Sequence, residues 1–434
     1  MIPAFLDRPL LPLRLARARA RGSYVPGDTL GAPFLVEGHD LAFPFGEASY
    51  NSLGRASDGT ILFAIGTKTL EAGARLFAAN PATSAVRVIA DLDRVLSGRD
   101  GAQIPQGKVH ADFSPVGDAL IGATHIGYYD PLATLEQPGT APGYAPYPGG
   151  WFFSIRGDAI AGLKQAPAGE GIITMSVDRD RGLAFALTWP RGLFLTLDLH
   201  TLELRNHGPQ FAAGELGAKS DGTWMRICRS IGVDPRSGHA YWCDNDGRIV
   251  RYDGTSMDAI ASTPHREMWR KVLWHPGEEV FYGITWKSSI LFRFDPADGT
   301  AIEIGTLSAS AAPATLALAL SPDDGSLHAL VTGPAVTRPK KIQLASTVVH
   351  MTFDLASGAT TKSGPLVLAD GRWITQSQSL LFDRGSAYSL CWVEVPRHDP
   401  EEKHEAVRRA RRHTREYRTR GYAEAMLLVR FPLR

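Results

Sequence analysis

The sequence predicts an all-β fold, a seven-bladed β-propeller closed by pairing of its N- and C-terminal strands. Short apolar strands with alternating polar positions recur along the chain. Turns rich in Asp, Pro and Gly separate these strands. The groups of strands repeat about every 40–60 residues, which is typical of propeller blades. We therefore expect one domain over residues 1–434.

The repeat is clearest when the turns are aligned. Similar strand–turn–strand segments occur at 177–189, 233–243, 274–286 and 320–332, and similar third strands occur at 193–201, 248–255, 290–300 and 348–358. Seven such units begin near residues 52, 107, 171, 227, 269, 314 and 373. Stacked blades cover one another's faces, which a single small sheet cannot do. Two β-sandwich domains are the alternative fold, but they predict no such repeat.

The ends of the chain carry the expected closure. A ring closes when both ends meet in one blade, so we expect residues 33–38 to pair with the last strand, residues 424–431. The rest of residues 1–40 reads as irregular. Residues 398–420 form a charged helical insertion with Glu and Arg at helical spacing. A solvated surface helix is favoured over an RNA-binding patch there, because acidic residues are mixed in and no series of aromatic residues accompanies them.

Composition excludes several classes of protein. Lys and Arg number 46 and Asp and Glu 45, so no global positive charge indicates nucleic acid binding. No apolar run reaches the roughly 18 residues of a membrane span. Asp7 and Arg8 interrupt the N-terminal apolar stretch, which makes a poor secretory signal, so we expect a cytoplasmic protein, or a periplasmic or secreted one if a leader has been removed. The three cysteines form no CxxC pair and are expected to be buried without a disulfide: Cys228, Cys243 and Cys391.

The candidate site lies in the segment 107–132. His110 and His125 are fifteen residues apart and flank a predicted hairpin, which would bring both imidazoles to one end of a sheet. In the aligned units, the Thr-His at 124–125 falls opposite Thr-Trp pairs that end in Trp189 and Trp286. Paired histidines can act as base, acid or ligand. The alternative interpretation is a pair of structural histidines in a polar channel.

These residues carry a resemblance to a known family. The runs KVH and ATHIGYY, then YPGGWFFSI at 147–155 and the segment 169–194, resemble the propeller-type polysaccharide lyases, which include ulvan lyases and L-rhamnose–glucuronate lyases. The resemblance covers about residues 107–200. It implies that His110 and His125 are acid/base residues and that Tyr147 is a proton donor or acceptor. It also implies a uronate-containing oligo- or polysaccharide as partner, cleaved by β-elimination.

The resemblance implies no cofactor for the chemistry, although a structural divalent metal such as calcium is compatible with it. No compact His/Cys ligand cluster is evident, and we predict no metal ligands.

The implied reaction needs a cation at the uronate carboxylate, and the fixed fork of an arginine suits that task. The family's arginines cannot be placed by motif. Arg226 and Arg229, at the start of the inner strand of the fourth unit, are candidates, as are Arg270 and Lys271 at a similar place in the fifth. Each could instead form a structural ion pair. Arg191 is a weaker candidate in a loop.

Tryptophans could stack on sugar rings or pack between blades. Trp189 is the chosen candidate for substrate binding, and the others are Trp224, Trp269 and Trp286.

Two other functions remain open. A calcium-dependent propeller lactonase would need acidic and Asn ligands, for which Asp244 and Asn245 are candidates. A non-catalytic propeller would bind a glycan or a protein without forming a product. No Gly-rich phosphate loop, GxSxG elbow or HExxH motif is present.

Overall fold

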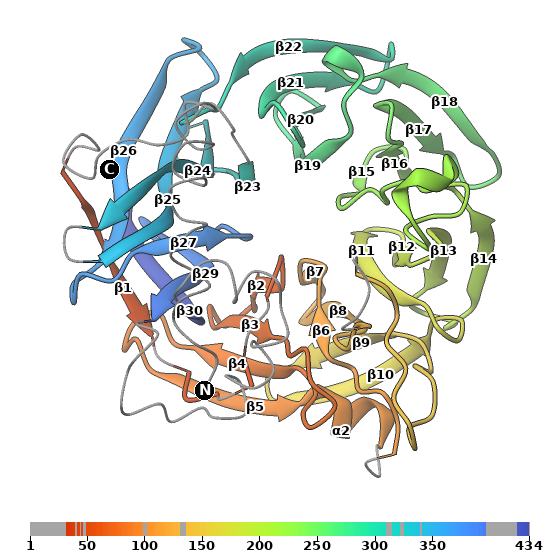
Figure 1. Cartoon of the computed structure of the whole chain (residues 1–434). Helices are drawn as coiled ribbons and strands as arrows, with labels where there is room; N and C mark the ends of the chain where they lie inside the picture. The colour runs from red at the N-terminus through yellow and green to blue at the C-terminus, as the bar shows by residue number, and fades with distance from the viewer. Residues whose placement is uncertain are drawn as a thin grey trace. The chain divides into compact units, whose positions relative to one another are not determined.

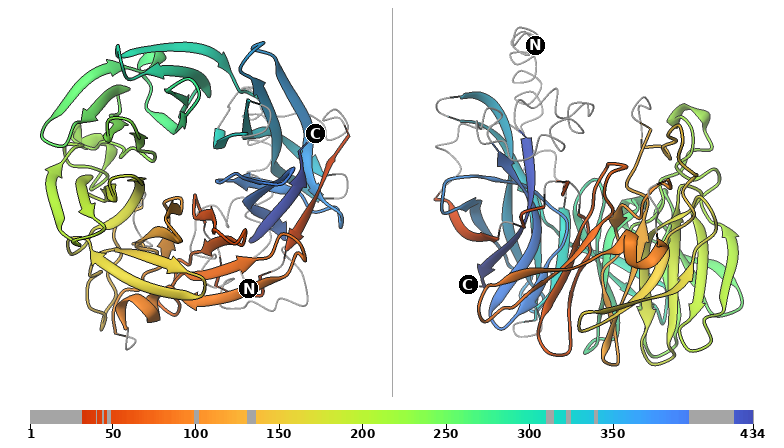
Figure 2. Two further views of the ribbon diagram at one scale, coloured as in Figure 1. Left: turned by 180° about the vertical axis from the view of Figure 1, so that it is seen from behind. Right: turned by 90° about the horizontal axis from the view of Figure 1, so that it is seen from below.

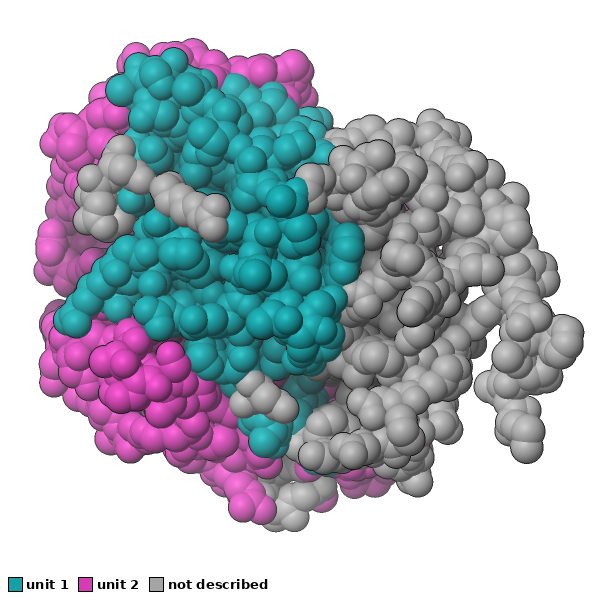
Figure 3. Space-filling model, turned by 90° about the vertical axis from the view of Figure 1, so that its left-hand side faces the viewer, with its two compact units in different colours: residues 1–47, 287–289, 305–434 teal, residues 48–286, 290–304 magenta. Residues whose placement is uncertain are grey.

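The computed structural model describes residues 32–39, 41–43, 45–46, 49–98, 102–130, 136–309, 315–321, 325–338, 341–395 and 423–433. The predicted charged helix at 398–420 and most of the irregular N-terminal segment lie outside these residues. Contacts divide the chain into two compact units, whose residues are coloured in Figure 3. Unit 2 comprises residues 48–286 and 290–304, and unit 1 comprises 1–47, 287–289 and 305–434. The prediction of a single domain stays a prediction.

Unit 2 consists of five antiparallel sheets (Figure 1). The first holds β2 (Leu53–Arg55), β3 (Ile61–Ile65), β4 (Arg75–Ala79) and β5 (Val86–Asp91), followed by helix α2 (Leu92–Ser97). The second holds β6 (Lys108–Val109), β7 (Ser114–Val116), β8 (Ala119–His125), β9 (Trp151–Arg156) and β10 (Ala159–Gln165). The third holds β11 (Gly171–Asp178), β12 (Leu183–Trp189), β13 (Leu193–Asp198) and β14 (Leu204–Pro209), followed by the 3₁₀ helix η2 (Lys219–Asp221).

The fourth and fifth sheets repeat this order. The fourth holds β15 (Gly232–Asp234), β16 (His239–Cys243), β17 (Arg248–Tyr252) and β18 (Met257–Ser262), followed by η3 (Pro264–Arg266). The fifth holds β19 (Trp269–His275), β20 (Val280–Thr285), β21 (Ile290–Asp295) and β22 (Thr300–Thr306). These five sheets confirm the predicted units that begin near residues 52 to 269.

The strands of one sheet differ in burial according to their order in the sheet. The second strands β12 and β20 are almost entirely buried, whereas the fourth strands β14 and β22 are largely exposed. Figures 1 and 2 show the first strands of unit 2 at the inner ends of their sheets and the fourth strands outside. Neighbouring sheets also contact each other through first strands, β11 with β15 and β15 with β19. Side chains on a first strand can therefore meet residues from several sheets.

The predicted Asp and Gly turns are present. Asp178 Oδ1 accepts hydrogen bonds from the backbone N–H groups of Asp180 and Arg181, and Gly182 follows at φ +63°. Asp234 and Gly238 repeat the arrangement between β15 and β16. An Asx turn followed by a left-handed glycine fixes a tight hairpin, which is why the motif recurs at the same place in successive units.

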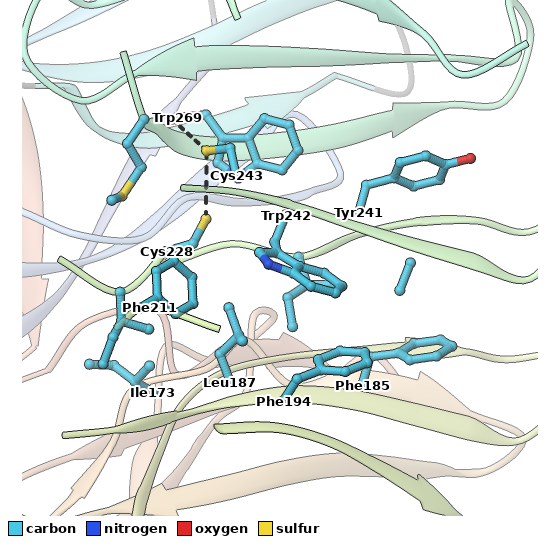
Figure 4. Packing of buried hydrophobic residues seen from close by; sticks show 14 of the residues in the cluster. Ile173, Phe185, Leu187, Phe194, Phe211, Cys228, Tyr241, Trp242, Cys243 and Trp269 are labelled. Carbon is cyan, nitrogen blue, oxygen red and sulfur yellow. Dashed lines mark hydrogen bonds between the residues drawn. The ribbon is translucent and has the colours of Figure 1, made fainter. Parts of the chain in front are cut away.

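Large apolar side chains fill the space between the third, fourth and fifth sheets (Figure 4). Phe194 stacks on Trp242 at 4.5 Å between ring centroids, and Trp269 donates its backbone N–H to Cys243 Sγ. Cys228 and Cys243 lie 3.9 Å apart at sulfur. All three cysteines are buried and free, which confirms the prediction that they act as small core residues.

Unit 1 contains one nine-stranded sheet in place of the two separate units predicted from residues 314 and 373. Its strands are β1 (Phe34–His39), β23 (Thr315–Leu320), β24 (Ser326–Arg338), β25 (Lys341–Asp354), β26 (Thr360–Leu368), β27 (Ile374–Ser377), β28 (Leu381–Asp383), β29 (Ser386–Val395) and β30 (Ala423–Pro432).

Strand β1 joins the two halves of this sheet. It pairs antiparallel with β30, with Gly38 opposite Val429, as predicted for the two ends of the chain. It also pairs parallel with β26, with Leu35 opposite Val367, which the sequence did not indicate. Strand β1 thus pairs along both of its edges, and this pairing joins the two predicted units into one sheet.

Candidate functional site

The predicted hairpin between His110 and His125 is present in unit 2. Strands β6 and β7 pair with β8, with Lys108 opposite His125 and Val116 opposite Ala119. The two imidazoles meet edge to face, with ring centroids 5.9 Å apart. Both side chains are buried, at 6% and 2% exposure. The hairpin therefore brings the two predicted histidines together.

The pocket for the His125 ring depends on Gly171 at the start of β11. A Cβ atom at this glycine would lie 2.0 Å from His125 Nδ1, which is closer than any real contact allows. The absent side chain leaves the room that the imidazole occupies. The edge of the His125 ring also contacts Trp189 at 5.4 Å between centroids.

Tyr129 joins His125 to a buried lysine. Its hydroxyl accepts a hydrogen bond of 2.8 Å from Lys108 Nζ and lies 3.4 Å from His125 Nε2. Lys108 is 1% exposed, and its ammonium group lies 4.3 Å from the Tyr129 ring centroid and 5.1 Å from that of Tyr50. Tyr50 in turn stacks on His110 at 4.3 Å. A connected group thus runs from Lys108 through both aromatic rings to the two histidines.

Three arginines complete the charged surroundings: Arg226 and Arg229 lie in the segment before β15, and Arg270 lies on β19. Arg229 pairs with Glu215 at 2.7 Å, with both side chains nearly buried. The guanidinium groups of Arg226 and Arg270 lie 4.6 and 4.7 Å from the ring centroid of Trp286. The carboxylate of Glu215 also accepts hydrogen bonds from the Trp189 indole at 3.2 Å and from the Ile227 amide at 2.9 Å.

Burial holds both histidines neutral, and these cations add to its effect. Burial lowers the pKa of His110 well below 6.5, and the positive charges of Arg229 and Arg270 add to this effect. The pKa of His125 is lowered in the same way by burial, Lys108 and Arg229. Among the described residues, His110 Nδ1 is buried without a hydrogen-bond partner. Both imidazoles are therefore poised to accept a proton once negative charge arrives.

Anionic groups lie among these cations. Although desolvation acts to raise it, the pKa of Glu136 lies below its usual range because of the positive charges on Lys108 and Lys68. Asp112 forms an ion pair with Lys271. Burial and the negative charge of Glu136 raise the pKa of Tyr129 well above 10, so its hydroxyl keeps its proton.

Tyr147 does not join this group. It is 4% exposed, and its hydroxyl donates a 2.7 Å hydrogen bond to Gln106 Oε1, which also accepts from Thr124. Successive residues of a strand point to opposite faces, so the contacts of Thr124 and His125 lie on opposite sides of β8. The contacts of Tyr147 are those of a core residue, and they do not support its predicted role in proton transfer. Tyr129, and not Tyr147, has its hydroxyl beside the His125 imidazole.

Trp189 is likewise placed as a packing residue. It is 1% exposed, with its ring against His125 and Tyr129 and its indole N–H directed to Glu215. This burial leaves no ring face for a sugar, contrary to our prediction for Trp189. Trp269 is fully buried, whereas Trp224 and Trp286 are half-buried. Arg191 pairs with Glu170 at 2.7 Å, which fits the structural alternative.

Sequence reasoning missed Lys108, Tyr129 and Tyr50. Lys108 stands two residues before His110 on an inner strand, so strand alternation places both on one face and could have identified it. Tyr129 follows His125 by four residues, within the segment that carries the family resemblance. No local signal marked Tyr50, because its place depends on how the first and second sheets meet.

The candidate metal ligands can be compared among the residues that the structure describes. They contain no group of three or more His, Cys, Asp or Glu side chains placed to hold an ion. The Asp244 carboxylate, a candidate ligand in the lactonase alternative, accepts hydrogen bonds from the amides of Asp246 and Arg248 and from the Arg248 side chain. It therefore stabilises the turn before β17. None of the described helices has the length and apolarity needed to cross a membrane.

Comparisons with known proteins show likeness in fold. No protein-family model matches the chain, and no curated protein matches its sequence. A periplasmic gluconolactonase of Pseudomonas aeruginosa is similar at a TM-score of 0.50 and 15% identity, over 79% of this chain and 93% of that one. The extracellular domain of BT4673 from B. thetaiotaomicron matches at 0.49 and 12%, over 92% of this chain but only 40% of that chain. A protein from Lactobacillus plantarum matches at 0.49 and 13%, over 79% and 93%.

Of these three likenesses, the gluconolactonase supports the fold, and at 15% identity it says nothing about activity. The chain is an all-β protein built of antiparallel sheets of the β-propeller kind. The predicted propeller architecture is confirmed at this level. The count of seven blades, the closure of the ring and the cytoplasmic location remain without support from these findings.

Proposed function

We propose that this protein is a lyase that cleaves a uronate-containing oligo- or polysaccharide by β-elimination. The observation that carries the proposal is the meeting of two neutral, buried histidines with a lysine-bonded tyrosine and nearby arginines. In β-elimination, a base removes the C5 proton of a hexuronate. The C5–H electron pair becomes the C4–C5 double bond, and the C4 oxygen leaves with a proton. The products are an unsaturated uronate and a free chain end.

The arginines suit the substrate carboxylate. Negative charge builds on this group as the C5 proton leaves, and a preorganised cation lowers the free energy of that state. Arg226 forms no ion pair with a described residue, while Arg229 is already held by Glu215. We assign the carboxylate to Arg226 and Arg270, whose guanidinium groups both lie over the Trp286 ring, with Arg229 adding positive charge. A bound carboxylate would also raise the low pKa of His110, which makes this imidazole a stronger base.

The positions of the charges suggest a division of roles. Arg229 is the foremost charge acting on the pKa of His110, with a further contribution from Arg270, whereas Lys108 is the foremost charge acting on His125. The carboxylate adjoins C5, so His110, on the arginine side, is the proposed base. Tyr129, held between Lys108 and His125, is the proposed acid that returns a proton to the C4 oxygen. Tyr129 replaces Tyr147 in this scheme.

The wider architecture is part of the proposal. We propose that the repeat closes as seven blades, with the nine-stranded sheet of unit 1 supplying the last two through β1. First strands would then face a common axis, where propellers bind ligands.

Ultraviolet absorbance of the conjugated C4–C5 double bond tests the activity. The purified protein is incubated with a panel of uronic acid glycans that includes ulvan and rhamnose-capped glucuronates. We expect absorbance to rise with the parent protein and to stay flat with His110→Ala and Arg226→Gln. Hydrolysis forms no such double bond, so cleavage without absorbance would overturn the lyase assignment. Binding without any cleavage would favour the non-catalytic glycan-binding alternative.

A further inference from the structure

A row of alternating cations and tryptophans extends from the candidate site. The ammonium group of Lys219 lies 4.9 Å from the Trp224 ring centroid. The guanidinium of Arg226 lies 5.9 Å from Trp224 and 4.6 Å from Trp286, and that of Arg270 lies 4.7 Å from Trp286. We call these five residues the cation–tryptophan row.

Burial increases along the row. Lys219 is exposed in η2, Trp224, Arg226 and Trp286 are half-buried, and Arg270 is only 6% exposed. Arg270 also contributes to the low pKa of His110. The row therefore begins at the solvent-exposed surface of unit 2 and ends at the buried Arg270, one of the two arginines assigned to the uronate carboxylate.

The row has unused binding capacity. Neither Lys219 nor Arg226 forms an ion pair with a residue that the structure describes. Burial and the charge of Arg229 lower the pKa of Arg226, which shows that its guanidinium sits among like charges. Within the described part of the chain, Trp224 Nε1 is buried without a hydrogen-bond acceptor. An anionic ligand rich in oxygen acceptors would offset the like charges around Arg226 and would accept a hydrogen bond from Trp224 Nε1.

We propose that the cation–tryptophan row is an extended subsite for an acidic polysaccharide chain, beyond the uronate that is cleaved. The choice of a uronate chain rests on the proposed function. Three cations separated by two indoles match a ligand that repeats anionic and neutral groups along its length. A small monoanion would occupy only the Arg226 and Arg270 end. The protein thus binds long chains more tightly than single disaccharides.

Single-stranded nucleic acid is the competing chain ligand, because stacking aromatics and arginines also bind bases and phosphates. The row favours a glycan for two reasons. The net charge of +1 gives no general attraction to nucleic acid. The row also includes Arg226 and Arg270, which the proposed function assigns to the carboxylate of a uronate.

Calorimetric titration tests the row with the full chain. A His110→Asn background keeps the ligand intact, and a His125→Asn background repeats the test in case the first fails to fold. The ligands are ulvan, polygalacturonate, alginate, a disaccharide with one glucuronate, and single-stranded oligothymidylate. We expect Trp224→Ala to weaken polysaccharide binding about tenfold and Lys219→Ala severalfold. Disaccharide affinity should stay unchanged in both variants, and Trp224→Phe should restore most of the loss.

Arg236→Ala is the matched control. Arg236 also lies over a tryptophan, 5.1 Å from the Trp274 ring centroid, but its charge is paired with Asp234 and Glu279. We expect no change in polysaccharide binding in this variant. Equal losses for polysaccharide and disaccharide, tighter binding of oligothymidylate, or no polysaccharide binding at all would each overturn the proposal.

This assay separates the two proposals. Binding that depends on Trp224, with no unsaturated product from the parent protein, supports the row and removes the lyase function. If the parent protein forms the unsaturated product but neither Trp224→Ala nor Lys219→Ala changes polysaccharide affinity, the lyase function is supported and the extended subsite is overturned.

Discussion

The ammonium group of Lys108 donates a 2.8 Å hydrogen bond to the hydroxyl of Tyr129 while lying over the face of the same ring at 4.3 Å. A buried lysine in this position stabilises negative charge on the tyrosine oxygen as its proton leaves. His125 Nε2 lies 3.4 Å from that oxygen. This relationship makes Tyr129 the most informative residue for testing the proposed chemistry.

The first prediction contrasts two tyrosines. Tyr129→Phe should lower the rate of elimination by about 100-fold, because it removes a proton donor from the reacting group. Tyr147→Phe should keep near-parental activity but lower the free energy of unfolding by about 1 kcal/mol through the lost hydrogen bond to Gln106. Product absorbance and thermal unfolding measure the two effects. Loss of activity in Tyr147→Phe, with Tyr129→Phe active, would instead favour Tyr147 as the proton donor or acceptor, as the family resemblance implies.

The second prediction concerns Lys108. Lys108→Met keeps most of the side-chain volume but removes the charge, and it should lower kcat more than it changes KM. The variant should also shift the pKa of His125 upward, because Lys108 is the foremost charge that lowers it. The histidine resonances in an NMR pH titration report this shift, which a merely structural lysine would not produce. Lys108→Arg, which keeps the charge, serves as the control and should leave the His125 pKa low.

The third prediction is a pH dependence of stability. His110 and His125 have folded-state pKa values well below the ordinary value of 6.5, so the unfolded chain binds protons first as the pH falls. Their contribution is constant above about pH 6.5, and stability is lost as the pH falls from there toward the folded-state pKa values. Denaturant unfolding should show this loss in the parent protein and a smaller loss in His110→Asn/His125→Asn. Identical pH profiles would contradict the burial of neutral imidazoles.

The fourth prediction tests the space around His125. Gly171→Ala would place a methyl group on Nδ1 of the imidazole and displace it from Tyr129. We expect loss of activity beyond tenfold together with reduced stability. Gly277→Ala is the control, because a Cβ there meets its nearest atom at 3.4 Å and its backbone is not left-handed. An active Gly171→Ala protein would show that the His125 position is not required.

The fifth prediction concerns Glu215, which holds Arg229, Trp189 and the Ile227 amide. Glu215→Ala leaves a nearly buried guanidinium without its partner and should cost about 3 kcal/mol of unfolding free energy. Glu215→Gln keeps an acceptor for the indole and the amide, so it should cost less. Chemical denaturation measures both values, and equal costs would mean that charge, not hydrogen bonding, dominates.

Local sequence patterns predicted much of the fold and part of the site. The hairpin of β7 and β8 follows from strand alternation around a turn, so it could be located with its two histidines. The Asp and Gly turns were readable for the same reason. Helix α2 was not predicted, because six residues carry almost no periodic signal. The pairing of β1 with β30 was expected from ring geometry, but its second edge on β26 was not.

The sequence by itself determined the strands, the turns and the pair His110 and His125, because these depend on contacts between residues close together in the chain. Only the tertiary structure decided which tyrosine stands beside His125 and which tryptophans are buried. Tyr129 and Tyr147 are equally plausible in the sequence, yet they lie on different sides of β8, and no local pattern fixes that. The cluster of Arg229, Arg270 and Lys108 likewise comes from three separate places in the chain, namely the segment before β15, strand β19 and strand β6. Its charges act on the histidines only because folding brings distant strands together in a buried, poorly solvated place.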